Sequence, residues 1–508
     1  MRPWRYDVRG DETVGNAAGS GNDLLPGKAG AQQRRVGAAA DTLGLLAGAL
    51  ALAWWYLASD LWLSLAGGLV FGVVVARWPQ AGAVLALWTA PWFRFPKEVD
   101  PSVLGLAAWG RASPLAISPG EFTILVTFAA WLLRAWWEGR RSRSAPQASD
   151  GPHTLAWWRE ALLSPLGLLL LVATLSLAWS EFLRFSLREY RTVVVEPALF
   201  ALVVRDLARR RRAWWVLLWS LVALGGSATA LALLRYVTGA ETVIAEGVQR
   251  AAAIYDSPNH LGLLLGRTLP VAVGLALFAP LRPRTWTALV IGIMLMAAAL
   301  TLTYSRGAWL ALGASLAFLA AMQGRRTLAA LALTGAVAAL AALALVPLER
   351  LASAATSSQR MYLWQATVQM LRDHPLTGVG LDNFLYHYPR YMLPEAWREP
   401  DLSHPHNLIL DFWVRLGILG LAVLGWVQAR FWWHARTALR RQSADPWARA
   451  GAVALMGGMV DFLTHGLVDN SFFLVDMAVI FWLMAMLMDG LARWDGRASS
   501  PPDRGRLQ

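Results

Sequence analysis

The feature that most restricts the fold of this 508-residue chain is a succession of long apolar segments separated by short polar ones. About fourteen of them are long enough to cross a hydrocarbon core of roughly 30 Å, which takes around 20 helical residues. A segment in lipid must satisfy its backbone hydrogen bonds internally, so these segments are expected to be helices. Hydrophobic residues make up 56% of the chain and charged residues 16%. The sequence therefore predicts an all-α, polytopic membrane protein.

The predicted spans run approximately over residues 42–58, 61–77, 80–93, 121–137, 161–179, 192–204, 214–234, 260–279, 286–304, 307–322, 328–346, 406–427, 448–467 and 472–488. The third and the sixth are short and fit re-entrant or tilted segments as well. Residues 1–40 lack the apolar core of a signal peptide and are rich in Gly, Ala, Asp and Arg, so we expect a disordered cytoplasmic tail. Residues 41–490 are expected to form the transmembrane domain, and 491–508 a cytoplasmic tail.

The net charge of +13 comes almost wholly from arginine, since Lys28 and Lys97 are the only lysines. Basic residues in short loops resist translocation and stay in the cytoplasm. The runs lie at Arg140, Arg141 and Arg143, Arg209 to Arg212, Arg282 and Arg284, Arg325 and Arg326, and Arg436, Arg440 and Arg441. All fall on one side if every span crosses, so both termini are predicted to be cytoplasmic and nucleic acid is not needed to explain the charge. The absence of cysteine excludes disulfides, thiolate nucleophiles and cysteine-based zinc sites.

The longest predicted external segment is 347–405, which holds three of the eight histidines and is followed directly by a fourth, His406. Loops of this length are usually functional or disordered. This one is rich in aromatic residues, and its Met361–Leu371 stretch has the apolar spacing of a helix. We therefore expect an ordered loop with a partly amphipathic helix on the outer membrane surface.

The turn Tyr304-Ser305-Arg306-Gly307 joins two apolar segments and carries a guanidinium that must face a cavity or headgroups. Arginine suits a bidentate grip on phosphate or carboxylate, although an interfacial arginine that reaches for headgroups fits the pattern too. Arg360 and Arg250 fall on the same predicted face, beside membrane boundaries. Together the three arginines favour a diphosphate held at the membrane surface. Signatures of nucleotide-binding loops, of HExxH metal sites and of dinucleotide folds are absent.

His404-Pro405-His406-Asn407 leads directly into another apolar segment. A neutral imidazole suits the removal of a proton from a sugar hydroxyl near neutral pH, whereas the alternative is that these residues only cap and anchor a helix. His260, His374 and His387 have the same anchoring interpretation. No tight ligand spacing supports a zinc site, so no metal and no cofactor is predicted.

Polar residues within spans offer a second interpretation of the chain. Glu196, Asp461, His465 and Arg267 lie in predicted spans, and Asp469 and Asp476 flank the last one. Such groups would suit a proton-coupled transporter. Structural ion pairs, for example of Arg191 or Arg267 with a carboxylate, are the competing explanation. We find no clear internal repeat of the kind that transporters often contain.

Several of these motifs occur in one order. They are Thr303–Leu310, Arg360 with Trp364, Asp373–Gly380, His406–Leu410 and Leu416–Gly420. The combination resembles the O-antigen ligase and O-antigen polymerase family over roughly residues 250–430. The resemblance implies a metal-independent glycosyltransferase of the GT-C type. Such an enzyme moves a glycan from an undecaprenyl-diphosphate carrier to a hydroxyl acceptor on the external side of the cytoplasmic membrane, in the synthesis of envelope polysaccharide.

Carried onto this chain, the resemblance makes Arg306 and Arg360 the ligands of the donor diphosphate and His406 the base. Arg250 and Asn259 become secondary donor contacts, and His404 and Asn407 become substrate contacts, with His404 a second candidate base. The pattern does not separate ligase from polymerase. It also leaves the acceptor open among lipid A core, a lipid-linked glycan, a cell-wall polymer and a protein. A transporter or flippase of lipid-linked glycans is the alternative from another class, and a membrane scaffold is a third.

Overall fold

The structure is a computed structural model that describes residues 26–99, 115–143, 164–240, 242–245, 248–330, 355–396 and 401–494. The chain divides into two units, Met1–Leu43 and Gly44–Gln508. The first helix begins at Pro26, inside the segment predicted as a tail, and continues into the second unit. All other elements belong to the second unit, which is described below.

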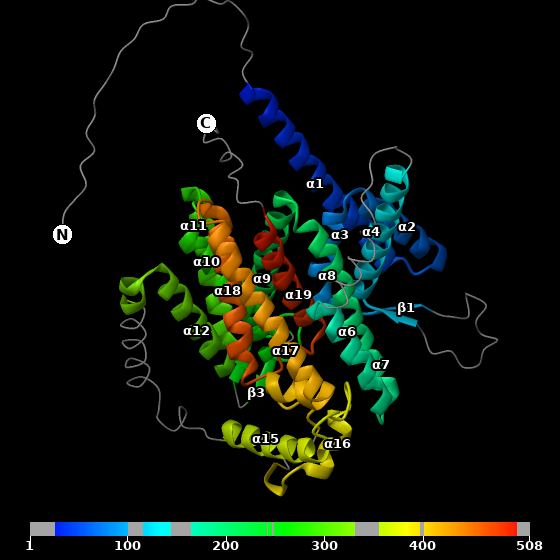
Figure 1. Cartoon of the computed structure of the whole chain (residues 1–508), viewed down its shortest axis with the longest axis vertical. Helices are drawn as coiled ribbons and strands as arrows, with labels where there is room; N and C mark the ends of the chain where they lie inside the picture. The colour runs from blue at the N-terminus through cyan, green and yellow to red at the C-terminus, as the bar shows by residue number, and fades with distance from the viewer. Residues whose placement is uncertain are drawn as a thin grey trace, which may run out of the picture. The chain divides into compact units, whose positions relative to one another are not determined.

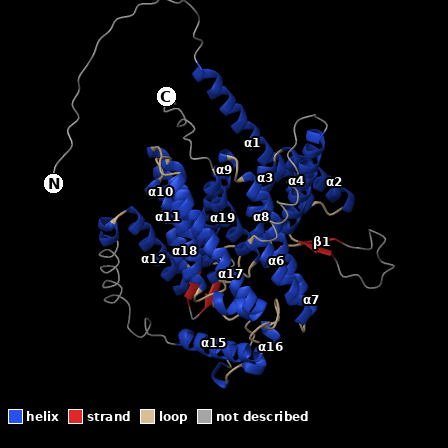
Figure 2. Cartoon of the chain, viewed as in Figure 1, coloured by secondary structure: helices blue, strands red, loops and turns tan. Residues whose placement is uncertain are grey.

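Helices dominate the described residues (Figure 2). They are α1 (Pro26–Leu57), α2 (Leu61–Arg77), α3 (Pro79–Thr89), α4 (Pro119–Arg143), α6 (Pro165–Ser176), α7 (Leu183–Glu189), α8 (Glu196–Leu207), α9 (Arg211–Thr238), α10 (Pro258–Phe278), α11 (Pro283–Leu302), α12 (Arg306–Gln323), α15 (Ala355–Asp373), α16 (Phe384–Tyr391), α17 (Leu408–Arg441), α18 (Pro446–Gly466) and α19 (Val475–Arg493). Short helical turns lie at η1 (Ala90–Trp92), η4 (Leu177–Trp179), η5 (Tyr190–Val195) and η6 (Pro394–Ala396).

Two small antiparallel sheets complete the described structure. Strand β1 (Lys97–Val99) pairs with β2 (Leu115–Ile117), with Lys97 opposite Ile117. Strand β3 (Val243–Ala245) pairs with β4 (Val248–Arg250), with Val243 opposite Arg250. The second hairpin places Arg250 shortly before α10.

Local sequence signals explain many of the helix starts. Helices α3, α6, α10, α11 and α18 each have a proline in the first turn, where its missing N–H costs no hydrogen bond. Ser305 caps α12, and Asn407 caps α17 by accepting hydrogen bonds from backbone amides of the first turn. The two caps belong to the motifs that the sequence analysis singled out.

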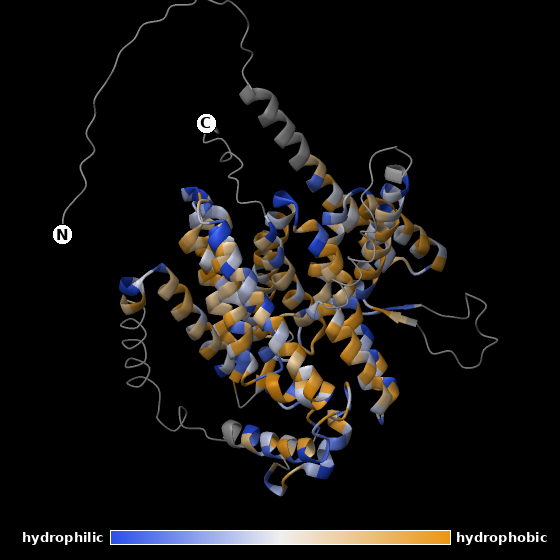
Figure 3. Ribbon diagram, in the orientation of Figure 1, coloured by the Kyte–Doolittle hydropathy of each residue, from blue (hydrophilic) through white to orange (hydrophobic). Residues whose placement is uncertain are grey.

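Within the described residues, every predicted span coincides with helix, while the span 328–346 lies mostly outside them. Among the helices that the structure describes, six are long and apolar enough to cross a membrane, namely Ala39–Leu57, Arg211–Thr238, Pro258–Phe278, Pro283–Leu302, Leu408–Arg441 and Val475–Arg493. The chain is thus a multi-pass, all-α membrane protein. The count of fourteen spans and the GT-C arrangement stay predictions. Figure 3 shows apolar residues along the middle of the helices and hydrophilic ones towards many helix ends.

Helices α10, α18 and α19 form the centre of the bundle (Figure 1). In the most apolar stretch of α19, 89% of the residues are buried, against 22% in α11. Helices α10 and α18 approach closely because Gly274 lies against Ala454 and Gly266 lies against the Asp461 carboxylate. Small residues allow such close contact between membrane helices. A side chain at Gly274 would clash with the Ala454 backbone and push the two helices apart, and one at Gly266 would displace the Asp461 carboxylate.

Helix α17 is broken at Gly417, which has φ 70° and ψ −168°. The break is filled by the segment after α15: the Val379 amide donates to Val414 O at 2.7 Å, and the Ile418 amide donates to Leu376 O at 3.1 Å. Gly417 lies directly against the Leu376 carbonyl, where a Cβ would clash. Two of the recognised motifs therefore form one structural unit, because the loop satisfies backbone groups that the break frees.

The predicted long loop is ordered over its described part. Met361–Leu371 lies within α15, which confirms the predicted helix, and α16 and η6 follow. Helices α15 and α16 lie across one end of the bundle, the end that also carries β3 (Figure 1). Residues 347–354 and 397–400 lie outside the described residues. The position of α15 on a membrane surface stays a prediction.

Candidate functional site

The histidine loop, residues 404–407, is held from three directions. The Asn407 side chain accepts hydrogen bonds from Ile409 N at 3.0 Å and Leu410 N at 3.1 Å, and its Nδ2 donates to Leu467 O at 2.9 Å. From α15, Trp364 Nε1 donates to Pro405 O at 3.0 Å. His406 has φ 49°, an uncommon backbone conformation for a residue with a side chain. Such strain persists where the surroundings enforce it, often at functional sites.

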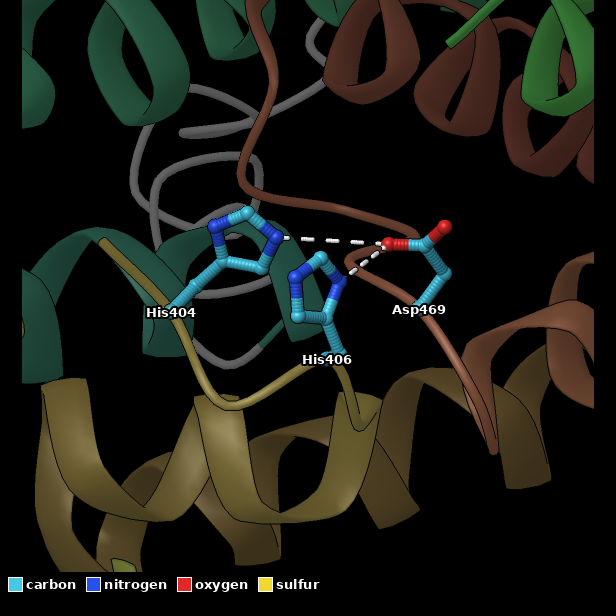
Figure 4. A group of neighbouring side chains, drawn as sticks. All are labelled: His404, His406 and Asp469. Carbon is cyan, nitrogen blue, oxygen red and sulfur yellow. Dashed lines mark hydrogen bonds and ion pairs between the residues drawn. The ribbon is translucent and has the colours of Figure 1, made fainter. Parts of the chain in front are cut away.

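His406 forms a hydrogen-bonded pair with Asp469, which lies between α18 and α19 (Figure 4). His406 Nδ1 is 2.7 Å from Asp469 Oδ1, and the Asn470 amide donates to the same oxygen at 2.8 Å. Burial alone would raise the pKa of Asp469, but the hydrogen bond from His406 and the neighbouring imidazoles outweigh it and lower this pKa. A charged carboxylate only accepts hydrogen bonds, so His406 Nδ1 must donate, and Nε2 is left to accept a proton.

His404 lies beside this pair and makes a longer contact with the same carboxylate (Figure 4). Its ring centroid is 4.2 Å from that of His406, its Nδ1 is 3.0 Å from Ser403 Oγ, and its Nε2 is 3.9 Å from Asp469 Oδ1. Burial and then the neighbouring His406 hold the pKa of His404 well below its usual value, and Arg415 and Arg360 lower it further. His404 is therefore neutral and a weaker base than an ordinary histidine.

The same three side chains have the composition of a metal site. The donor atoms of His404, His406 and Asp469 all lie within 4.8 Å of one another, which is close enough for one ion. Two imidazoles and a carboxylate are a common ligand set for transition metals. The sequence did not suggest this proximity, because Asp469 is 63 residues from His406. The direct 2.7 Å contact between His406 and Asp469 satisfies both groups without an ion.

Arg415 connects the histidine loop to two buried carboxylates. Its Nε donates to Asp411 at 2.6 Å, its Nη1 contacts both carboxylate oxygens of Glu189 at 2.5 Å, and its Nη2 donates to Ser403 O at 3.3 Å. Burial raises the pKa of Glu189 to about 7, although the Arg415 charge acts in the opposite direction. Arg415 thus ties α7 and α17 to the residue that precedes His404. Sequence reasoning did not single it out, although its spacing of four residues from Asp411 was visible.

Arg306 begins α12, after a turn in which Tyr304 has φ 50°. Its neighbour Gly307 packs against His465 and Val468, in the segment that leads to Asp469. The Arg306 side chain is exposed. The turn therefore lies next to the loop that carries the carboxylate of the histidine pair.

Arg250 and Asn259 contact each other and the same turn. Arg250 Nε donates to Thr303 O at 2.7 Å, and its Nη2 donates to Asn259 Oδ1 at 3.1 Å. Arg360 lies on α15, close enough to His404 for its charge to lower the pKa of that histidine. The fold thus gathers all seven predicted site residues around two neighbouring loops, the histidine loop and the Arg306 turn.

The charged residues of the transporter interpretation are engaged in structural pairs, whereas neither ring nitrogen of the buried His465 has a hydrogen-bond partner among the described residues. Arg267 Nη1 donates to Asp461 Oδ2 at 2.7 Å, and both side chains are buried. Arg191 pairs with Glu121 and lies 3.4 Å from Glu196. These contacts confirm the structural pairing that the sequence left as one explanation, and they occupy the carboxylates that a proton path would use.

His260 is an anchor of a similar kind. Its Nε2 lies 2.8 Å from Asp476 Oδ1, and the hydroxyl of Tyr255 donates to Asp476 Oδ2 at 2.7 Å. The Tyr255 and His260 rings stack at 4.0 Å. The pair fixes the start of α10, and with it Asn259, against the start of α19.

A family model described as O-antigen ligase matches residues 291–425. This segment contains Arg306, Arg360 and the whole histidine loop, whereas Arg250, Asn259 and Asp469 lie outside it. No curated protein matches the chain.

Proposed function

We propose that this chain is a membrane glycosyltransferase of O-antigen ligase or polymerase type, and the match of residues 291–425 to the O-antigen ligase family model supports the proposal. The donor is a glycan linked to undecaprenyl diphosphate, and the acceptor is a hydroxyl on the external face of the cytoplasmic membrane. The observation that carries the proposal is the pairing of His406 with the buried Asp469 beside the Arg306 turn.

His406 is the base of the proposed reaction. Its Nε2 takes the proton of the acceptor hydroxyl as the oxygen attacks the anomeric carbon. The bond between that carbon and the diphosphate breaks, the electron pair leaves with the diphosphate, and the configuration inverts. Asp469 keeps Nδ1 protonated and stabilises the imidazolium that forms. His404, with its lowered pKa, serves as a neutral neighbour that contacts substrate.

Arg306 and Arg360 hold the leaving diphosphate in this proposal. Guanidinium forks bind phosphate oxygens in a bidentate manner and stabilise the charge that grows as the bond breaks. Arg250 is a secondary contact of the same diphosphate, and its hydrogen bond to Asn259 orients its guanidinium. With three arginines to neutralise the leaving group, the reaction is proposed to be independent of metal.

The test is glycan transfer in liposomes with purified protein, an undecaprenyl-diphosphate oligosaccharide and a mixture of hydroxyl acceptors. We expect product from the wild type, none from His406→Ala, and near-normal product from His374→Ala, a histidine of the same loop outside the site. The size distribution of the product separates single-step ligation from polymerisation.

Two results would count against the proposal. If His406→Ala transferred glycan at the wild-type rate, His406 would not be the base. Movement of the donor across the bilayer without any transfer would favour the flippase.

A further inference from the structure

An apolar groove of about 530 Å³ lies between α17 and the end of α18. Its lining consists of Leu408, Ile409, Leu421, Leu424, Gly425, Gln428, Leu463, Thr464 and Leu467. Thr464 Oγ1 donates to Val460 O, and Gln428 Nε2 donates to Met459 Sδ. Gln428 Oε1 is the one side-chain polar atom of this lining that is buried without a hydrogen-bond partner among the described residues. A groove of this volume and lining suits a hydrocarbon chain better than a sugar, which needs hydrogen-bonding partners.

The groove opens beside the proposed base. Leu408 and Ile409 directly follow the histidine loop, and Asn407 Nδ2 donates to the carbonyl of Leu467. Leu467 precedes Asp469 by two residues. Ile409 and Leu467 are 44% and 48% exposed, so the mouth is open to the outside of the bundle.

The Arg306 turn contacts a different face of α18. Gly307 packs against His465 and Val468, and Ser315 Oγ on α12 donates to Gly457 O at 3.1 Å. The groove instead uses Leu463 and Leu467, which are four residues apart and share the face towards α17. The end of α18 therefore separates the groove from the Arg306 turn, with the loop that carries Asp469 between them.

We propose that this groove binds the hydrocarbon chain of a lipid-anchored acceptor and presents its hydroxyl to His406. The inference rests on the proposed function. An inverting transfer places the attacking hydroxyl and the leaving diphosphate on opposite sides of the anomeric carbon. The arginine side takes the diphosphate, so the base side, where the groove opens, takes the acceptor.

Gly425→Trp tests the groove directly. A Cβ at Gly425 meets no atom within 4 Å, so a large side chain fills the groove without a clash at its base. Gly313→Trp on α12 is the matched control, since a Cβ there is equally unhindered and the residue does not line the groove. Both variants place a tryptophan on an apolar helix, so any general loss of stability or of membrane insertion caused by this residue should be the same in both.

The binding probe is a dodecyl glycoside with a diazirine at the end of its chain, added to the full chain in phosphatidylethanolamine and phosphatidylglycerol liposomes. We expect crosslinks at residues 421–428 and 463–467 in the wild type and Gly313→Trp, and their loss in Gly425→Trp. A phosphatidylglycerol with the same diazirine is the comparison. Equal labelling of the groove by this lipid, or crosslinks elsewhere, would overturn the proposal.

The transfer assay supplies the second readout. With a lipid-anchored acceptor, Gly425→Trp should raise KM at least about tenfold, the loss expected when roughly two methylene groups are displaced. With the same sugar on a water-soluble aglycone, wild type and variant should differ little. Equal KM values of wild type and Gly425→Trp for the lipid-anchored acceptor would refute the proposal that the groove binds this acceptor. If the glycoside crosslinks specifically to the groove but the wild type transfers no glycan, the proposed function would be refuted, whereas binding of a hydrocarbon chain in the groove would still hold.

Discussion

Replacing Asp469 by Asn removes the charge behind His406 and keeps the shape of the side chain. The wild-type contact is a 2.7 Å hydrogen bond to a buried carboxylate. Hydrogen bonds to charged groups contribute about 1.5–3 kcal/mol. If the imidazolium loses that stabilisation in the transition state, kcat should fall roughly 10- to 150-fold, since each 1.4 kcal/mol is a factor of ten. Retention of substrate KM would place the loss in the chemical step.

The assay is the initial rate of glycan transfer in liposomes across a range of pH. Asp489→Asn is the matched control: it removes a buried carboxylate that lies 3.2 Å from His434 Nδ1, outside the candidate site. A rate for Asp469→Asn within about twofold of wild type, with both proteins folded, would refute the role of the pair.

Four further predictions follow from the same contacts. Arg306→Lys and Arg360→Lys should each lose at least about tenfold in transfer rate, because the charge remains but the bidentate fork does not; wild-type rates would indicate headgroup anchoring. Transfer should persist in excess EDTA, and a loss restored by added metal would make His404, His406 and Asp469 a metal site. Arg415→Met should lower the free energy of unfolding by about 3–5 kcal/mol in thermal denaturation, since it leaves buried carboxylates unpaired. Burial raises the pKa of Glu189 from 4.5 to about 7. Between these two pH values the folded state binds more protons than the unfolded state, so the stability of the protein falls as pH rises from 4.5 to about 7. Glu189→Gln should reduce this pH dependence of the unfolding midpoint.

The sequence alone supported two explanations for the charged residues within the helices. Both Arg267 and Arg191 turn out to contact carboxylates, and Arg267 with Asp461 is buried at the centre of the bundle. A pattern of single residues cannot distinguish a proton path from an ion pair, because the difference lies in which side chain faces which. For Arg267, that difference is decided by the packing of α10 against α18.

The sequence by itself determined the helices and most of the candidate site. Apolar length, proline at helix starts and the caps Ser305 and Asn407 act within a few residues, so they can be read locally. The motifs likewise marked Arg306, Arg360 and His406. Only the tertiary structure decided which groups support them: Asp469 reaches His406 across 63 residues, and Glu189 reaches Arg415 across 226. Hydrogen bonds of this kind depend on how the helices pack. A local sequence pattern does not show which distant residues this packing brings into contact.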